Sequence, residues 1–123
     1  MNIVRTEKGW GAHLIVGNSC NFRRNTLLDN DIKKIIGSTV GAYISPLYPN
    51  KFTDIGHNRY YETMVFEATL QGKYWDADVT KEVKFDSSWA IDHFGDNSDN
   101  EANDMHEVVV KEIMQKMEQG EIQ

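Results

Sequence analysis

The sequence predicts an α+β domain, in which an antiparallel β-sheet in meander order is followed by one C-terminal amphipathic helix. Two observations support this prediction. Residues 58–85 alternate between apolar and polar side chains on both sides of a glycine-containing break, which is typical of a long β-hairpin. Residues 99–119 repeat apolar side chains every three or four positions, which is typical of a helix with one buried face. We therefore expect a single domain over residues 1–123, β-rich over 1–95.

The central hairpin, residues 58–85, has a register that its turn residues suggest. With Gln71 and Gly72 as the loop, Ala68 lies opposite Trp75, and the pairing continues along both strands. One face then collects four further cross-strand pairs: Phe66–Ala77, Met64–Val79, Glu62–Lys81 and Tyr60–Val83. The other face is mostly polar, so we expect it to be the outer face of the sheet.

Shorter elements lie on either side of this hairpin. An extended start at 2–5 leads into two predicted hairpins, one turning at Gly17-Asn18 and one at Gly37-Ser38. Residues 46–57 contain both prolines and mark the longest loop, in which Tyr48 and Phe52 have no obvious local core and suggest an inter-subunit contact.

The C-terminal part is expected to complete the core. Trp89 and Phe94 should close one end of it. The helix should be capped by Asp99 or Asn100 and should stop at Gly120. Its apolar face is predicted to contain Ala102, Met105, Val109, Ile113 and Met117.

Composition argues against several classes of function. The net charge of −6 argues against binding of polymeric DNA or RNA, because neutralising phosphates requires a basic surface. Cys20 is the only cysteine, which rules out an internal disulfide and suggests a small buried side chain in a reducing cytosol. The chain shows neither a signal-peptide pattern nor an 18-residue apolar run, so we expect no membrane span and a cytoplasmic protein.

Arg23 and Arg24 are the first candidate binding residues. They alternate along a predicted strand, so they should point to opposite faces, and a guanidinium offers a planar fork of donors to phosphate or carboxylate. Asn25 adds a short polar group that can form hydrogen bonds with hydroxyl groups of a ligand. Phe22 and Trp10 are candidate stacking residues for a nucleobase. The alternatives are solvated or carboxylate-paired arginines, and a Trp10 that caps the core.

The polar face of the central hairpin supplies the second group of candidates. Arg59 beside Tyr61 would offer a guanidinium for phosphate and a ring for a base. The register places Glu67 opposite Asp76, with Asp78 nearby, so a cation is expected close to these carboxylates. We favour a lysine or arginine of the protein over Mg²⁺ or Ca²⁺ in that position.

Catalytic motifs are missing from the sequence. There is no glycine-rich phosphate loop and no nucleophile motif, and the histidines lack metal-ligand spacing. We therefore expect no catalytic residues, no metal and no cofactor, and we predict binding rather than catalysis.

Seven motifs span nearly the whole chain: KGWGAH, FRRNTLL, STVG, NRYYETMVFEA, YWDADV, FDSSWAI and NEANDMHEVVV. They resemble those of a widespread family of small phage-encoded proteins, and the chain is most similar to the phage sponges of the Thoeris anti-defence type. That resemblance implies a non-enzymatic homo-oligomer, a dimer or a higher assembly such as a hexamer, in the cytoplasm of the infected bacterial host. It implies sequestration of cyclic ADP-ribose isomers made by TIR proteins, with cyclic trinucleotides as a further ligand between subunits.

Two other functions remain open from the sequence. One is a phage inhibitor that occludes a host defence enzyme through an exposed surface such as the 46–57 loop. The other is a small structural or assembly protein of a phage particle.

Overall fold

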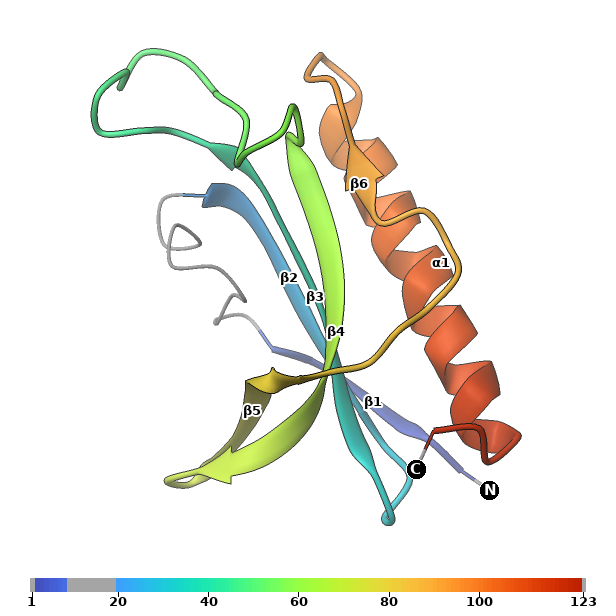
Figure 1. Ribbon diagram of the computed structural model, residues 1–123. Coiled ribbons are helices and arrows are strands. Elements are labelled where there is room, and N and C mark those ends of the chain that lie inside the picture. Colours follow the sequence, from blue (N-terminus) through green and yellow to red (C-terminus); the bar gives the residue numbers. More distant parts are fainter. Residues whose placement is uncertain (1, 9–19, 123) are drawn as a thin grey trace.

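The computed structural model describes residues 2–8 and 20–122. Within these ranges lie six strands and one helix (Figure 1): β1 Val4–Lys8, β2 Cys20–Asp29, β3 Lys34–Tyr43, β4 Tyr61–Gln71, β5 Tyr74–Glu82, β6 Ala90–Ile91 and α1 Ser98–Glu118. The strands form one antiparallel sheet in the order β1-β2-β3-β4-β5, and β6 pairs with β4. The predicted α+β meander with a C-terminal helix is confirmed. Trp10 and the predicted Gly17-Asn18 turn lie outside the described residues.

The helix α1 packs along one face of the sheet (Figure 1). Its buried side chains include the whole predicted set, Ala102, Met105, Val109, Ile113 and Met117. They contact apolar side chains of β2, β3 and β4, among them Phe22, Leu28, Ile35, Tyr61 and Val65.

Both ends of α1 lie close to their predicted positions. The N-cap is Asn97 rather than Asp99 or Asn100. At the other end Gly120, with φ of 70°, donates its backbone N–H to the Met117 carbonyl at 3.1 Å. This left-handed residue closes the helix where the sequence predicts it.

The expected outer face of the central hairpin is in fact the face that α1 covers. Tyr61 and Thr63 were expected on an open polar surface, but they are 0% and 1% exposed. Phe66 and Ala68, whose side chains point to the opposite face, are also buried. The alternation of apolar and polar side chains shows which residues share a face of the strand, but it does not show against which face the helix packs. Here side chains on both faces of β4 are buried.

The loop between β4 and β5 is Gly72-Lys73, one residue later than predicted. Leu70 pairs with Trp75 and Ala68 with Ala77, a register two residues away from the expected one. A bulge between Phe66 and Ala68 then ends the regular pairing, so the expected pairs beyond it do not form. The φ of Gly72 is 66°, a value that glycine adopts at little cost, which explains why the loop begins there.

The strand β3 runs without a break through Gly37-Ser38. Gly37 pairs with Thr26 on one side and Val65 on the other, so the hairpin predicted at this point is wrong. The turn comes earlier, where the Asn30 side-chain oxygen accepts the backbone N–H groups of the residues at 32 and 33, at 3.0 and 2.7 Å. A Cβ on Gly37 would lie 3.4 Å from Val110, so this glycine marks close packing between sheet and helix rather than a turn.

Residues 44–60 form the longest connection between strands among the described residues, as predicted. Within it, Phe52 stacks on Phe94 with ring centroids 4.6 Å apart. Phe94 also lies beside Tyr60 and Tyr61, but it is 41% exposed and Trp89 is 45% exposed, so neither side chain closes the core as predicted. Cys20 is buried as predicted, and burial raises the pKa of its thiol.

Candidate functional site

A buried polar cluster lies between α1 and the sheet, centred on His106. Its imidazole is 0% exposed and sits between two threonines of neighbouring strands. Nε2 lies 2.7 Å from Oγ1 of Thr26 on β2, and Nδ1 lies 2.6 Å from Oγ1 of Thr39 on β3. Thr39 in turn lies 2.7 Å from Oγ1 of Thr63 on β4. The side chain of His106 therefore ties the helix to three strands at once.

The hydrogen atoms in this chain of contacts can be assigned from the end at Glu7. Its carboxylate only accepts, so the Thr26 hydroxyl donates to it, at 2.7 Å. Thr26 must then accept from Nε2–H of His106, which leaves Nδ1 to accept from Thr39. Nδ1 carries no proton because the imidazole is neutral at pH 7, since burial lowers its pKa to about 4.

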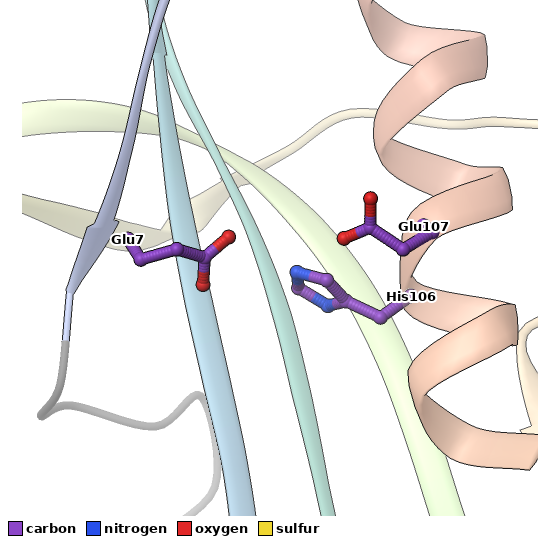
Figure 2. Close-up of side chains that lie close together, drawn as sticks. All are labelled: Glu7, His106 and Glu107. Atoms are coloured by element: carbon purple, nitrogen blue, oxygen red, sulfur yellow. The ribbon is translucent and has the colours of Figure 1, made fainter. Parts of the chain in front are cut away.

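Two arginines, Arg5 and Arg24, and two glutamates lie around His106. Figure 2 shows Glu7 reaching from β1 toward α1, which carries Glu107. Arg24 links both carboxylates, with Nη1 3.0 Å from Glu107 and Nη2 2.7 Å from Glu7. Arg5 donates Nη1 to Glu107 at 2.9 Å, and this hydrogen bond contributes most to lowering the pKa of Glu107 to about 2.

Glu7, His106 and Glu107 offer three possible metal-ligand atoms within 4.8 Å of one another. Each of these residues already has partners in the protein, because the arginines bind both carboxylates and the threonines bind both ring nitrogens. A divalent cation would also face two guanidinium groups at close range, which is electrostatically unfavourable. We therefore assign this cluster a structural role, holding α1 against β1 and β2.

A pocket of about 370 Å³ opens on another part of the molecule, where β5 leaves β4. The regular β4–β5 pairing ends at the bulge, and β6 rejoins β4 only at its start. Residues 83–89, which we call the strap, cross this gap (Figure 1). The pocket lies between the strap and β4, and its lining comprises Arg59, Glu62, Thr63, Met64, Glu82, Lys84, Phe85 and Trp89.

Arg59 and Trp89 form the most distinctive pair in this pocket. The guanidinium carbon lies 5.6 Å from the centroid of the indole, within the range of a cation–π contact. Arg59 is held in place by Nε, which donates to the Gly56 carbonyl at 3.0 Å, and by Nη1, 2.5 Å from the Glu62 carboxylate. The pocket thus presents a fixed cation beside an indole that is 45% exposed.

Lys84 adds a second cation at the rim of the pocket. Its side chain is 86% exposed and its Nζ lies 3.1 Å from the Glu82 carboxylate. An exposed pair of this kind contributes at most about 1 kcal/mol, so an anionic ligand can displace Glu82 at little cost. The buried Glu62 instead stays with Arg59, because separating them would break the ion pair of a carboxylate that is 3% exposed.

The candidate residues near the arginine doublet are not brought together into one site. Arg23 is exposed, whereas Arg24 lies on the helix side and forms the ion pairs described above. Phe22 is buried in the core against Tyr61, with ring centroids 5.6 Å apart at 86°. Asn25 is 4% exposed. Carboxylate pairing, the alternative reading of the doublet, therefore holds for Arg24.

The candidates on the central hairpin are likewise separated. Of Arg59 and Tyr61, only Arg59 lines the pocket, because the hydroxyl of Tyr61 donates to Asp99 in the first turn of α1 at 2.6 Å. Burial and the Asp99 carboxylate raise the pKa of Tyr61.

The acidic group proposed on the same face does not form. Glu67 binds Lys33 at 2.8 Å, the protein cation that we expected, but Thr69 rather than Glu67 lies opposite Asp76. Asp76 accepts the N–H of the residue after it, and Asp78 accepts the N–H and hydroxyl of Thr80. Each of these carboxylates is therefore satisfied separately on the protein.

Sequence reasoning missed the roles of His106 and Trp89. One signal for His106 was available, because it lies four residues after Ala102 and three before Val109, on the buried face of the helix. No comparable signal marked Trp89, because the strap has no periodicity and its position depends on where β5 leaves the sheet.

Comparisons of the chain with protein-family models, with curated proteins and with solved structures find no match. Among the described residues, no helix has the length and apolar character that crossing a lipid bilayer requires.

Proposed function

We propose that this protein binds and sequesters a small cyclic nucleotide signal without altering it, in the pocket of Arg59 and Trp89. The observation that carries the proposal is a fixed guanidinium beside a half-exposed indole, in a pocket of about 370 Å³. This volume lies within the range of small-molecule sites. A nucleotide has the two groups that such a pair recognises, a flat base and a phosphate.

In this proposal the base stacks on Trp89 and the phosphates face the two cations. Stacking of a base on an aromatic side chain contributes about 1–3 kcal/mol. Lys84 supplies an exposed ammonium that is free to exchange Glu82 for phosphate, while Arg59 stays fixed by Gly56 and Glu62. The net charge of −6 does not oppose this mode, because salt screens distant charges over about 8–10 Å.

The proposal requires no catalytic group in the pocket. Its lining carries two carboxylates, those of Glu62 and Glu82, which are paired with Arg59 and Lys84. Its one hydroxyl side chain, that of Thr63, is hydrogen-bonded to Thr39 beneath the helix. Cyclic ADP-ribose isomers are the proposed ligands, and in this proposal the protein acts as a homo-oligomer in the cytoplasm of the infected bacterial host, as its resemblance to phage anti-defence sponges implies.

Replacing Trp89 by alanine is expected to weaken binding of cyclic ADP-ribose isomers at least about tenfold, because the stacking surface is lost. Isothermal titration against the isomers measures the change. Trp75→Ala is the matched control, because Trp75 also carries a cation over its ring, with Lys34 Nζ 4.6 Å from the centroid, but lies outside this pocket.

The proposal predicts that the control variant binds like the unmodified protein and that denaturing the complex releases intact nucleotide. Equal affinity of Trp89→Ala and the unmodified protein would rule out this pocket. Recovery of a hydrolysed product would replace sequestration with enzymatic turnover.

A second candidate function is inhibition of a host defence enzyme by direct contact. The observation that favours it is the exposure of Leu47 and Tyr48, 81% and 56%, in the 44–60 connection. Exposed apolar side chains on a projecting loop are typical of protein interfaces. A capture experiment with two variants tests this alternative. It is supported if Trp89→Ala still captures a host enzyme and Leu47→Asp does not.

A further inference from the structure

The strap that forms one wall of the pocket is attached to α1 by hydrogen bonds to one carboxylate, that of Glu112, and by a longer ion pair between Lys116 and Asp86 at 4.0 Å. Glu112 accepts the backbone N–H of Asp86 at 2.7 Å and that of Ser87 at 2.9 Å, and the Ser87 hydroxyl also donates to it. Burial opposes ionisation of Glu112, but these three donors outweigh it and lower the pKa of the carboxyl group. One side chain of the helix thus satisfies two successive backbone amides of the strap.

The attachment lies between the two residues of the strap that contribute rings to the pocket. At one end, Val83 donates its N–H to the Val65 carbonyl at 2.8 Å, and at the other the Trp89 carbonyl accepts from Thr63 at 2.8 Å. Phe85 and Trp89 both line the pocket. The middle of the strap, which carries Asp86 and Ser87, is held by Glu112 on the helix side.

We propose that Glu112 is a positioning residue that fixes the strap and thereby sets the Trp89 wall of the pocket. It is not one of the residues that line the pocket, and its side chain is 17% exposed. Lys116 lies 3.4 Å from it, which keeps the carboxylate oriented and charged. Without the carboxylate, the two amides lose their acceptors and the middle of the strap can move away from α1. This inference rests on the proposed function for its ligand, but the geometry of the strap can be tested without one.

The test compares Glu112→Ala with Glu118→Ala, a control at an exposed glutamate of the same helix. Hydrogen exchange at the Asp86 and Ser87 amides is expected to become at least about tenfold faster in Glu112→Ala and to stay unchanged in the control. Titration with cyclic ADP-ribose is expected to show about tenfold weaker binding in Glu112→Ala alone. Glu112→Gln should restore much of the slow exchange and much of the affinity, because its side-chain carbonyl still accepts hydrogen bonds from the strap.

The possible outcomes separate the two ideas. Unchanged exchange at both amides in Glu112→Ala would overturn the positioning role, whatever the ligand does. Faster exchange with unaltered affinity would overturn the link between the strap and the pocket. If the unmodified protein binds no cyclic ADP-ribose, the proposed function is contradicted. Faster exchange in Glu112→Ala would then still show that Glu112 anchors the strap.

Discussion

Replacing Gly41 by alanine is expected to lower the free energy of unfolding by about 3 kcal/mol. A Cβ at this position would lie 2.2 Å from Cδ2 of Tyr61 and 2.7 Å from the backbone oxygen of Tyr60. Tyr61 cannot move aside easily, because it is fully buried, packs on Phe22 and donates its hydroxyl to Asp99. The strain therefore falls on the backbone of β3 and β4. Urea denaturation followed by circular dichroism measures the loss.

Gly95→Ala is the matched control for this experiment. Nothing lies within 4 Å of a Cβ built on Gly95, so the same chemical change is expected to alter stability by less than about 0.5 kcal/mol. If Gly41→Ala unfolds at the urea concentration of the unmodified protein, the close approach of Tyr61 to β3 is not a feature of the folded state.

Acidification from pH 6.5 to pH 4 is expected to lower the free energy of unfolding by about 3 kcal/mol through His106. Burial lowers the pKa of this imidazole from 6.5 to about 4, and Arg24 and Arg5 act in the same direction, against Glu7 and Glu107. Between these two values the unfolded chain binds a proton that the folded chain does not. Stability is therefore fully present above pH 6.5 and falls as the pH decreases toward 4.

The hydrogen-bond directions around His106 give this expectation a structural cause. A proton added to Nδ1 would face Thr39, which donates to that nitrogen in the neutral state. Thr39 would have to turn its hydroxyl hydrogen away from Nδ1, and pointing it toward Thr63 would reverse the donor and the acceptor of the hydrogen bond between the two threonines. Because all three side chains are buried, water cannot take over the lost hydrogen bonds.

Urea denaturation from about pH 7.5 to about pH 4.5 tests the prediction, with two histidine variants as comparisons. His106→Gln should be less stable at neutral pH but should lose less stability on acidification, because its side chain cannot be protonated. His93 is exposed, and hydrogen bonds to Asp92 and Glu101 raise its pKa, so it favours the folded state at low pH and loses that effect as the pH rises. The free energy of unfolding of His93→Gln should therefore still fall fully on acidification. An equally steep decline in His106→Gln would show that other groups cause the acid sensitivity.

The local patterns of the sequence were enough to predict the central hairpin and the helix of this fold. Alternation over 58–85 predicted the β4–β5 hairpin, and the helical period predicted each of the five apolar positions on the buried face of α1. The errors came where a single residue type in the sequence was compatible with two structural roles. Gly37 looked like a turn residue but provides close packing in β3, and Gly72 opened the loop instead of ending it.

The candidate site was less predictable than the fold. Arg59 was identified, but with Tyr61 as its aromatic partner instead of Trp89. Arg24 was predicted to bind phosphate, with carboxylate pairing as the alternative, and its carboxylate partners Glu7 and Glu107 come from opposite ends of the chain. Contacts between residues so distant in sequence leave no local pattern.

The sequence by itself determined which residues share a face of each element, where the helix ends, and that the chain forms an antiparallel meander. These features depend on side-chain periodicity and turn chemistry, which act over a few residues. Only the tertiary structure decided which face of β4 the helix covers, that His106 lies buried and neutral between two strands, and that the strap places Trp89 beside Arg59. These features depend on how whole elements pack, and several arrangements satisfy the same local pattern until the core selects one of them.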